Sequence, residues 1–143
     1  MTTIIYKDER PDPGQYMQLF STTGWNDEYK VGVDELAGVL AGSLYVIAAF
    51  DGDDLVGMGR VVTDGVMHAM LYDVIVKPSH QNQGIGSTIL KKLIERCKEA
   101  GVREIQLFSA RGKAPFYRKR GFLDRPVDAP GMSLKRESSL RLV

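Results

Sequence analysis

The feature that most constrains the fold is a glycine-containing loop, Gln81–Gly86, which joins a strand-like pattern to a helical one. The segment before it, Val66–Val76, is rich in apolar and β-branched residues and is predicted to be a strand. From Ile85 to Cys97 apolar residues recur every four positions, with charged residues between them, which predicts an amphipathic helix. A further strand, Ile105–Phe108, follows. Because the two strands of such a β-α-β unit lie parallel in one sheet, we predict an α/β fold.

The rest of the chain adds strands and helices around this unit. The other predicted strands are Thr3–Tyr6, Leu44–Phe50, Leu55–Val62 and Met132–Leu134, and the other predicted helices are Pro13–Phe20, Val33–Leu40 and Lys113–Arg120. The strands between Leu44 and Val76 follow one another through short turns, which is typical of an antiparallel meander. The length of 143 residues is that of one domain, so residues 1–143 are expected to form a single one.

Composition argues against several classes of function. Lys and Arg number 19 against 18 Asp and Glu, a net charge of +1, so no strong overall charge favours nucleic acid or an anionic membrane. One cysteine, Cys97, and two histidines make a disulfide or a Cys- or His-rich metal site unexpected. The first residues lack a signal-peptide pattern, and no apolar run approaches the roughly 20 residues that span a bilayer. A cytoplasmic protein is therefore expected.

The glycine loop has the chemistry of a phosphate site. Gly84 and Gly86 allow a tight turn and a close approach of the backbone, and the helix that follows presents unpaired N–H groups with a partial positive charge. A turn without a ligand explains the glycines equally well. A dinucleotide fingerprint would need glycine where Ile89 stands, and the Gly-Lys-Ser/Thr end of a P-loop is missing. A nucleotide-hydrolysing enzyme is therefore not expected.

Two segments together carry a family resemblance. The stretch Val74–Gly86 resembles the acetyl-CoA signature of the GNAT acetyltransferase superfamily, in which a strand ending in Val-x-Pro precedes a glycine loop. The stretch Ala114–Phe122 is similar to the later Ala-x-x-Phe-Tyr-x-x-x-Gly-Phe motif of that family. The resemblance implies a mixed central sheet with an antiparallel meander, splayed central strands and flanking helices. It also implies acetyl-CoA as co-substrate.

The resemblance implies where acetyl-CoA would bind. The backbone of the last meander strand would pair with the pantetheine arm, and the amides of the loop would hold the pyrophosphate. The implied cofactor-binding residues are Val74, Ile75, Val76, Gln81, Asn82, Gln83, Gly84, Ile85, Gly86, Ser87 and Tyr117. The family often has Arg where this chain has Gln81, which removes one charge contact and leaves the amide cradle. It often has Asn where Arg111 stands.

The resemblance also implies the reaction, which is direct attack of an amine on the thioester. Tyr117 matches the motif tyrosine and is expected to protonate the departing thiolate, since a phenol of pKa about 10 is protonated at neutral pH. Its alternative role is that of a core aromatic residue. Many relatives have a Glu or His base at Met70 or Tyr72, and this chain has neither. Asp73 could bind the substrate amine or relay its proton, or equally could be a buried acid that hydrogen-bonds neighbouring loops.

Strand alternation would place Met70, Tyr72 and Val74 on one face and Asp73 on the other. The expected function is N-acetylation of a small-molecule primary amine. The alternatives are a protein lysine or N-terminal acetyltransferase, and a non-catalytic acyl-CoA-binding module. The expected partners are acetyl-CoA and the amine, without nucleic acid or membrane, and relatives suggest a homodimer.

Overall fold

The computed structural model describes residues 3–135. The chain divides into a first unit, Met1–Leu107, and a second, Phe108–Val143, and each is described by itself. The prediction that residues 1–143 form one domain stays a prediction.

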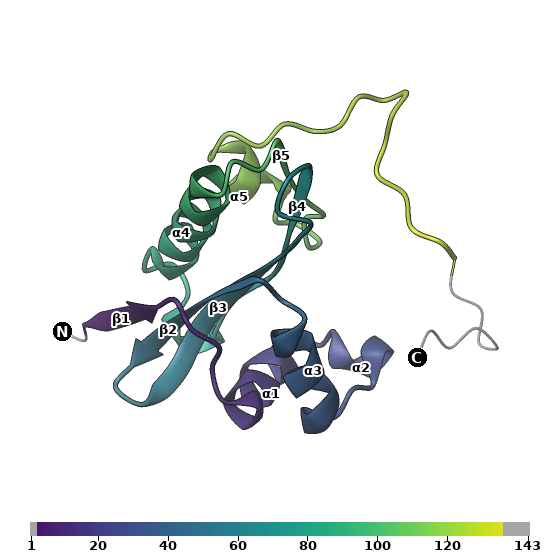
Figure 1. Cartoon of the computed structure of the whole chain (residues 1–143). Helices are drawn as coiled ribbons and strands as arrows, with labels where there is room; N and C mark the ends of the chain where they lie inside the picture. Colours follow the sequence, from purple (N-terminus) through teal and green to yellow (C-terminus); the bar gives the residue numbers. More distant parts are fainter. Residues whose placement is uncertain (1–2, 136–143) are drawn as a thin grey trace. The chain divides into compact units, whose positions relative to one another are not determined.

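The first unit contains a five-stranded sheet in the order β1-β2-β3-β4-β5 (Figure 1). Its strands are β1 (Ile4–Lys7), β2 (Tyr45–Asp51), β3 (Asp54–Thr63), β4 (His68–Val76) and β5 (Glu104–Leu107). Strands β1 to β4 pair antiparallel, whereas β4 and β5 pair parallel. The predicted meander and the predicted β-α-β unit are both confirmed, and with them the mixed α/β fold.

The helices of this unit are α1 (Pro13–Ser21), α2 (Asn26–Tyr29), α3 (Val33–Ala41), the short 3₁₀ helix η1 (Pro78–His80) and α4 (Ile85–Glu99). Helix α1 begins at a proline, and the Asp12 carboxylate caps it by accepting from the Gln15 N–H at 3.2 Å. The sequence pattern does not predict α2, because a single turn is too short to show a helical period.

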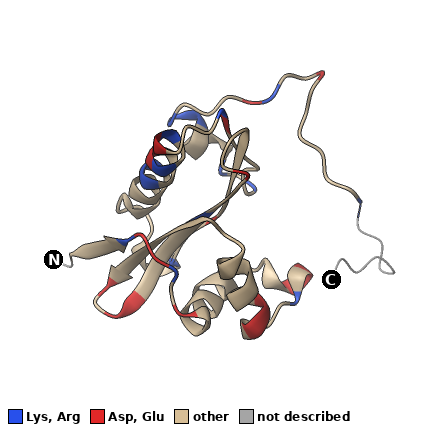
Figure 2. Cartoon of the chain, viewed as in Figure 1, with Lys and Arg blue, Asp and Glu red and all other residues tan. Residues whose placement is uncertain are grey.

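Helices cover both faces of the sheet, with α4 on one side and α1 and α3 on the other (Figure 1). Ile85, Ile89, Leu90, Leu93 and Cys97 of α4 are buried, while Lys91, Glu95 and Lys98 are exposed, as the period predicts. Figure 2 shows charged positions of both signs along α4. Glycines let α4 approach β3 closely. A Cβ on Gly59 would lie 2.7 Å from Leu93 Cδ1, so a larger side chain there would displace the helix or its residues.

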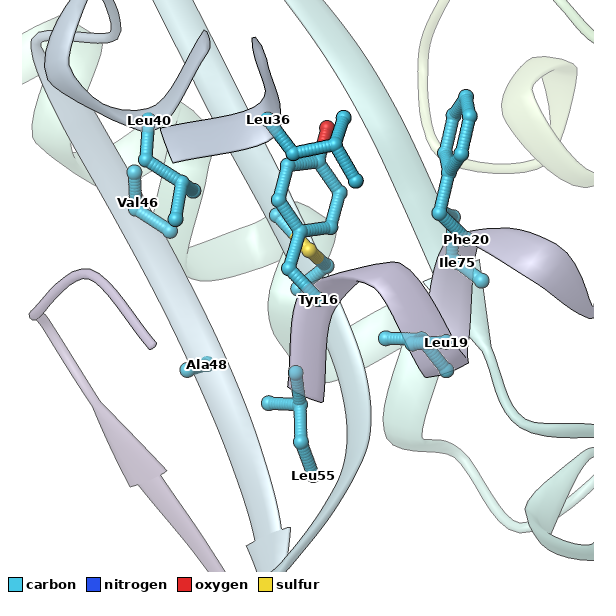
Figure 3. Packing of buried hydrophobic residues seen from close by; sticks show 10 residues of the cluster. Tyr16, Leu19, Phe20, Leu36, Leu40, Val46, Ala48, Leu55 and Ile75 are labelled. Atoms are coloured by element: carbon cyan, nitrogen blue, oxygen red, sulfur yellow. The ribbon is translucent and has the colours of Figure 1, made fainter. Parts of the chain in front are cut away.

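The other face has its own apolar core, to which α1, α3 and the sheet all contribute (Figure 3). Its buried residues are Tyr16, Leu19, Phe20, Leu36, Leu40, Val46, Ala48, Leu55, Met58 and Ile75. Tyr16 is large and polar, yet only 1% of its surface is exposed. A phenol buried to this extent needs a hydrogen-bond partner, and that partner lies in β4.

The second unit contains α5 (Ala114–Arg118), close to the helix predicted over Lys113–Arg120. The strand predicted at Met132–Leu134 is wrong, because this segment is irregular and its apolar residues are 82% and 79% exposed. An extended segment becomes a strand only when another strand takes up its N–H and C=O groups, and a local pattern cannot supply that partner. Within residues 3–135, no helix is both long and apolar enough to cross a membrane.

Candidate active site

The loop before α4 has the backbone that a phosphate site requires. Gly84 is the N-cap of α4 and has a φ of 83°, in the left-handed region that favours glycine. Asn82 has a φ of 62°, a conformation that asparagine tolerates better than most residues. The first bond of α4 runs from the Thr88 N–H to the Gly84 carbonyl at 3.0 Å, so the amides of Ile85 and Gly86 precede the first closed turn. They lie where an anion is favoured.

The segment that leads into the loop is tied to the β2–β3 turn. His80 Nε2 lies 2.9 Å from Asp51 Oδ2, and its Nδ1 lies 2.7 Å from Ser79 Oγ. Lys77 donates to the Asp54 carboxylate at 2.8 Å. The contacts of His80 with Asp51 and of Lys77 with Asp54 join residues more than twenty positions apart and hold the start of the loop, and no local sequence pattern points to them.

Strand β4 extends beyond its parallel neighbour. The pairs with β5 run from His68↔Glu104 to Leu71↔Leu107, where β5 ends. On its other side β4 stays paired with β3 as far as Gly57↔Val76. The stretch Tyr72–Val76 therefore continues past the last β4–β5 pair, which is the separation of central strands that the family resemblance implies. A sheet edge of this kind can bind an extended ligand through its main chain.

A bulge interrupts β4 within this stretch. The register with β3 passes from Arg60↔Tyr72 to Met58↔Ile75, so two residues of β4 stand opposite one of β3. Asp73 lies in the bulge with a φ of 53°.

The bulge overturns the predicted alternation of faces. Val74 lies on the α4 side, because its Cγ2 is 3.5 Å from the point a Cβ on Gly59 would occupy, beside Leu93. Tyr72 and Asp73 both lie on the α1 side, where Arg60 contacts each of them. The predicted set of Met70, Tyr72 and Val74 on one face is therefore wrong, because one extra residue shifts every later side chain to the other face.

The Asp73 carboxylate is held by residues from two other elements. Its Oδ2 accepts from the Tyr16 hydroxyl of α1 and from Arg60 Nε of β3, the latter at 2.7 Å. The Asp73 and Arg60 side chains are 13% and 16% exposed. Burial, reinforced by the negative charge of Asp73, raises the pKa of Tyr16, so its hydroxyl stays a donor. Local sequence patterns missed Tyr16, and the only signal for Arg60 is a single charge in an apolar strand.

Tyr117 lies on α5 in the second unit, packed edge-on against Phe116 at 5.1 Å and Phe122 at 6.0 Å between ring centroids. Burial raises the pKa of its phenol above the ordinary value of 10, which keeps it protonated at neutral pH. In the same unit Arg118 binds Asp124 through two bonds of 2.7 and 2.9 Å. Arg118 is thus already paired.

These features fit acetyl-CoA. The helix N-terminus after Gly84 suits the pyrophosphate, and the β4 edge suits the amide groups of the pantetheine arm. A Cβ on Gly84 would meet nothing within 4 Å, so the loop has open space at that point. Among residues 3–135, no group of three or more metal-ligating side chains forms a metal site.

Comparison with known proteins agrees with this geometry. The model of the acetyltransferase (GNAT) family matches residues 5–122. The chain belongs to the GNAT acetyltransferase family. It is therefore an acyltransferase domain, and acetyl-CoA is the co-substrate of its family.

The relatives and structural neighbours of this chain have names that describe acetyltransferases. An uncharacterized N-acetyltransferase ycf52 from Porphyra purpurea is 30% identical over 119 residues, 80% of this chain and 67% of the relative. The histone acetyltransferase TAP1 of Glycine max is 29% identical over 90% of this chain and 66% of its own. Serotonin N-acetyltransferase 2, chloroplastic, of Oryza sativa is 35% identical over 57% of this chain and 40% of its own.

A GNAT-family acetyltransferase from Streptococcus pneumoniae has a solved structure that aligns with a TM-score of 0.74 and 32% identity. The alignment covers 96% of this chain and 100% of that one. The chain spans about two thirds of the length of the first two relatives.

Proposed function

We propose that this protein is an N-acetyltransferase that transfers the acetyl group of acetyl-CoA to the primary amine of a small molecule by direct attack. The observation that carries the proposal is the β4 edge beyond Leu71, which leads into the glycine loop at the start of α4. It brings a main-chain binding edge and an anion site into one continuous segment. The name of the rice relative, a serotonin N-acetyltransferase, supports a small amine as acceptor.

The proposed cofactor-binding residues are those of the β4 edge and the loop. Val74, Ile75 and Val76 would offer main-chain groups to the pantetheine arm. The loop from Gln81 to Ser87 would hold the pyrophosphate through its amides, without an arginine at its first position. The Gln81 side chain donates to the Val76 carbonyl at 3.0 Å, so it supports the loop rather than supplying charge. When bound, acetyl-CoA supplies the activated acetyl group.

Tyr117 is the proposed proton donor to the leaving thiolate. Its phenol is protonated at neutral pH, as a general acid must be, and burial raises its pKa above the ordinary value. For Asp73 we propose a positioning role rather than contact with the amine. Its Oδ2 already accepts two hydrogen bonds, as in the second of the two interpretations the sequence allows, although the donors lie on α1 and β3 rather than in loops.

A protein lysine or N-terminal amine is the second candidate acceptor, favoured by the name of the soybean relative, a histone acetyltransferase.

We also propose a cytoplasmic location and a homodimer. The chloroplastic name of the rice relative makes the plastid the competing location, and cell fractionation separates the two. Light scattering of the purified protein tests the dimer.

The experiment measures release of free CoA from acetyl-CoA with a panel of arylalkylamines, polyamines and histone or N-terminal peptides. Mass spectrometry of the acetylated product identifies the acceptor. We expect turnover with a small amine and a kcat at least 10-fold lower in Tyr117→Phe. Tyr45→Phe is the control, since its ring contact with Arg96 survives the loss of the hydroxyl. Turnover with peptides alone would favour the second candidate, and CoA binding without any turnover would favour a binding module.

A further inference from the structure

The bulge in β4 carries a conformation that needs support. Asp73 has a φ of 53°, in the left-handed region that residues with a side chain adopt uncommonly. Such a conformation persists only where surrounding contacts impose it. The peptide that follows Asp73 belongs to the edge proposed to bind acetyl-CoA, so its direction matters for that site.

The contacts that impose it come from separate elements of the first unit. Tyr16 of α1 and Arg60 of β3 both donate to the same oxygen of Asp73. Arg60 is held in turn, because its second nitrogen, Nη1, donates to the buried Ser43 hydroxyl at 3.3 Å and its guanidinium lies 5.1 Å from the Tyr72 ring centre. The Asp73 side chain is therefore fixed from the helix side and from the neighbouring strand.

The charges in this cluster balance locally. Arg60 and Asp73 form an ion pair with little exposure, and Tyr16 adds a neutral donor. Removal of one partner of a buried pair leaves the other charge uncompensated, so the three side chains stabilise one arrangement together. The Arg60–Asp73 ion pair fixes the direction of the backbone rather than adding much to the free energy of unfolding.

We propose that Tyr16, Arg60 and Asp73 form a bulge clamp that fixes the backbone of β4 at Asp73–Val74 and so positions the acetyl end of the co-substrate. The three are positioning residues, and this role rests on the proposed acetyl transfer. The clamp lies in the bulge, whereas the pyrophosphate loop begins at Gln81, beyond the end of β4. A loosened clamp therefore impairs turnover more than the binding of CoA.

The test compares Tyr16→Phe, which removes one hydroxyl, with Tyr45→Phe as matched control. Calorimetry gives the Kd for CoA, steady-state kinetics gives kcat, and NMR gives amide exchange rates. For Tyr16→Phe we expect kcat to fall at least 10-fold and the Kd to change less than 3-fold. Amide exchange at Val74 and Ile75 should rise at least 10-fold, with the amide of Leu93 in α4 unchanged. Tyr45→Phe should leave all three quantities as in the wild type.

Two Asp73 variants separate side-chain contacts from folding. Asp73→Asn keeps an acceptor oxygen and tolerates the left-handed region, so it should retain more kcat than Asp73→Ala. The clamp is refuted if Tyr16→Phe exchanges at Val74 like the wild type, or if exchange rises equally in α4, which would indicate global destabilisation. If the wild type acetylates no amine, the proposed function fails, and the exchange rates still decide whether the clamp exists.

Discussion

Replacement of Gly84 by valine separates binding of the co-substrate from folding. Gly84 has a φ of 83°, and a Cβ added there would meet nothing within 4 Å. The folded state therefore suffers backbone strain without a steric clash, about 1–3 kcal/mol. A domain of this size is stabilised by about 5–15 kcal/mol, so Gly84→Val should remain folded at 25 °C. Its Tm should fall by roughly 2–12 °C, at about 2–4 °C per kcal/mol.

The effect on CoA is expected to be larger. The valine would stand at the N-cap of α4, beside the amides proposed to hold the pyrophosphate, and its branched side chain would occupy the open space there. One lost hydrogen bond to a charged group corresponds to about 1.5–3 kcal/mol. Since about 1.4 kcal/mol is tenfold in affinity, the Kd for CoA should rise about 10- to 150-fold. Isothermal titration with CoA measures it, and differential scanning calorimetry measures the Tm.

Gly65→Val is the matched control. Gly65 has a φ of 80° and equally open space, but it lies in the β3–β4 turn, at the opposite end of β4 from the loop. The Tm of Gly65→Val should fall by a similar amount, and its Kd for CoA should equal that of the wild type. The reasoning is refuted if Gly84→Val binds CoA like the wild type, or if Gly65→Val loses as much affinity.

Four further predictions concern the fold. Gly59→Ala should destabilise by about 1–3 kcal/mol, because its Cβ would lie 2.7 Å from Leu93 Cδ1. Gly38 lies on the exposed side of α3 with open space around it, so Gly38→Ala should instead raise the free energy of unfolding by about 0.5–1 kcal/mol. Urea unfolding measures both variants, and a change of the same sign in the two would contradict the packing argument. The buried Cys97 thiol, whose pKa burial raises, should react with DTNB only after unfolding, and rapid reaction in native buffer would show that the α4 face opens. Asp12→Ala removes the cap of α1 and should lower the free energy of unfolding by about 1 kcal/mol, and no change in urea midpoint would show that the cap is dispensable.

The sequence predicts most elements of the first unit closely. Helix α4 begins at Ile85, where its period starts, and the meander strands lie within about two residues of their predicted ends. These predictions succeed because each period reflects which side of an element is buried. The tight turn of the glycine loop is predicted correctly for a related reason, since Gly84 occupies a backbone region that few other residues enter easily.

The sequence predicts less of the site beyond the loop. The contact of Tyr16 with Asp73 joins residues 57 positions apart, and that of Arg60 with Asp73 joins residues 13 apart. Neither has a local signature, because the partners belong to different elements and each looks ordinary in its own segment. The family resemblance implied a role for Asp73 without naming the residues that hold it.

By itself, the sequence determined the order of most strands and helices, the family and the place of the glycine loop, because periodicity, glycine and motif spacing are properties of neighbouring residues. Only the tertiary structure decided which way Asp73 points. Its left-handed φ in the bulge reverses the alternation of β4, and that conformation persists because Tyr16 and Arg60 reach it from other elements. Strand alternation read from the chain assumes a regular ladder, and one extra residue held by distant partners is enough to break it.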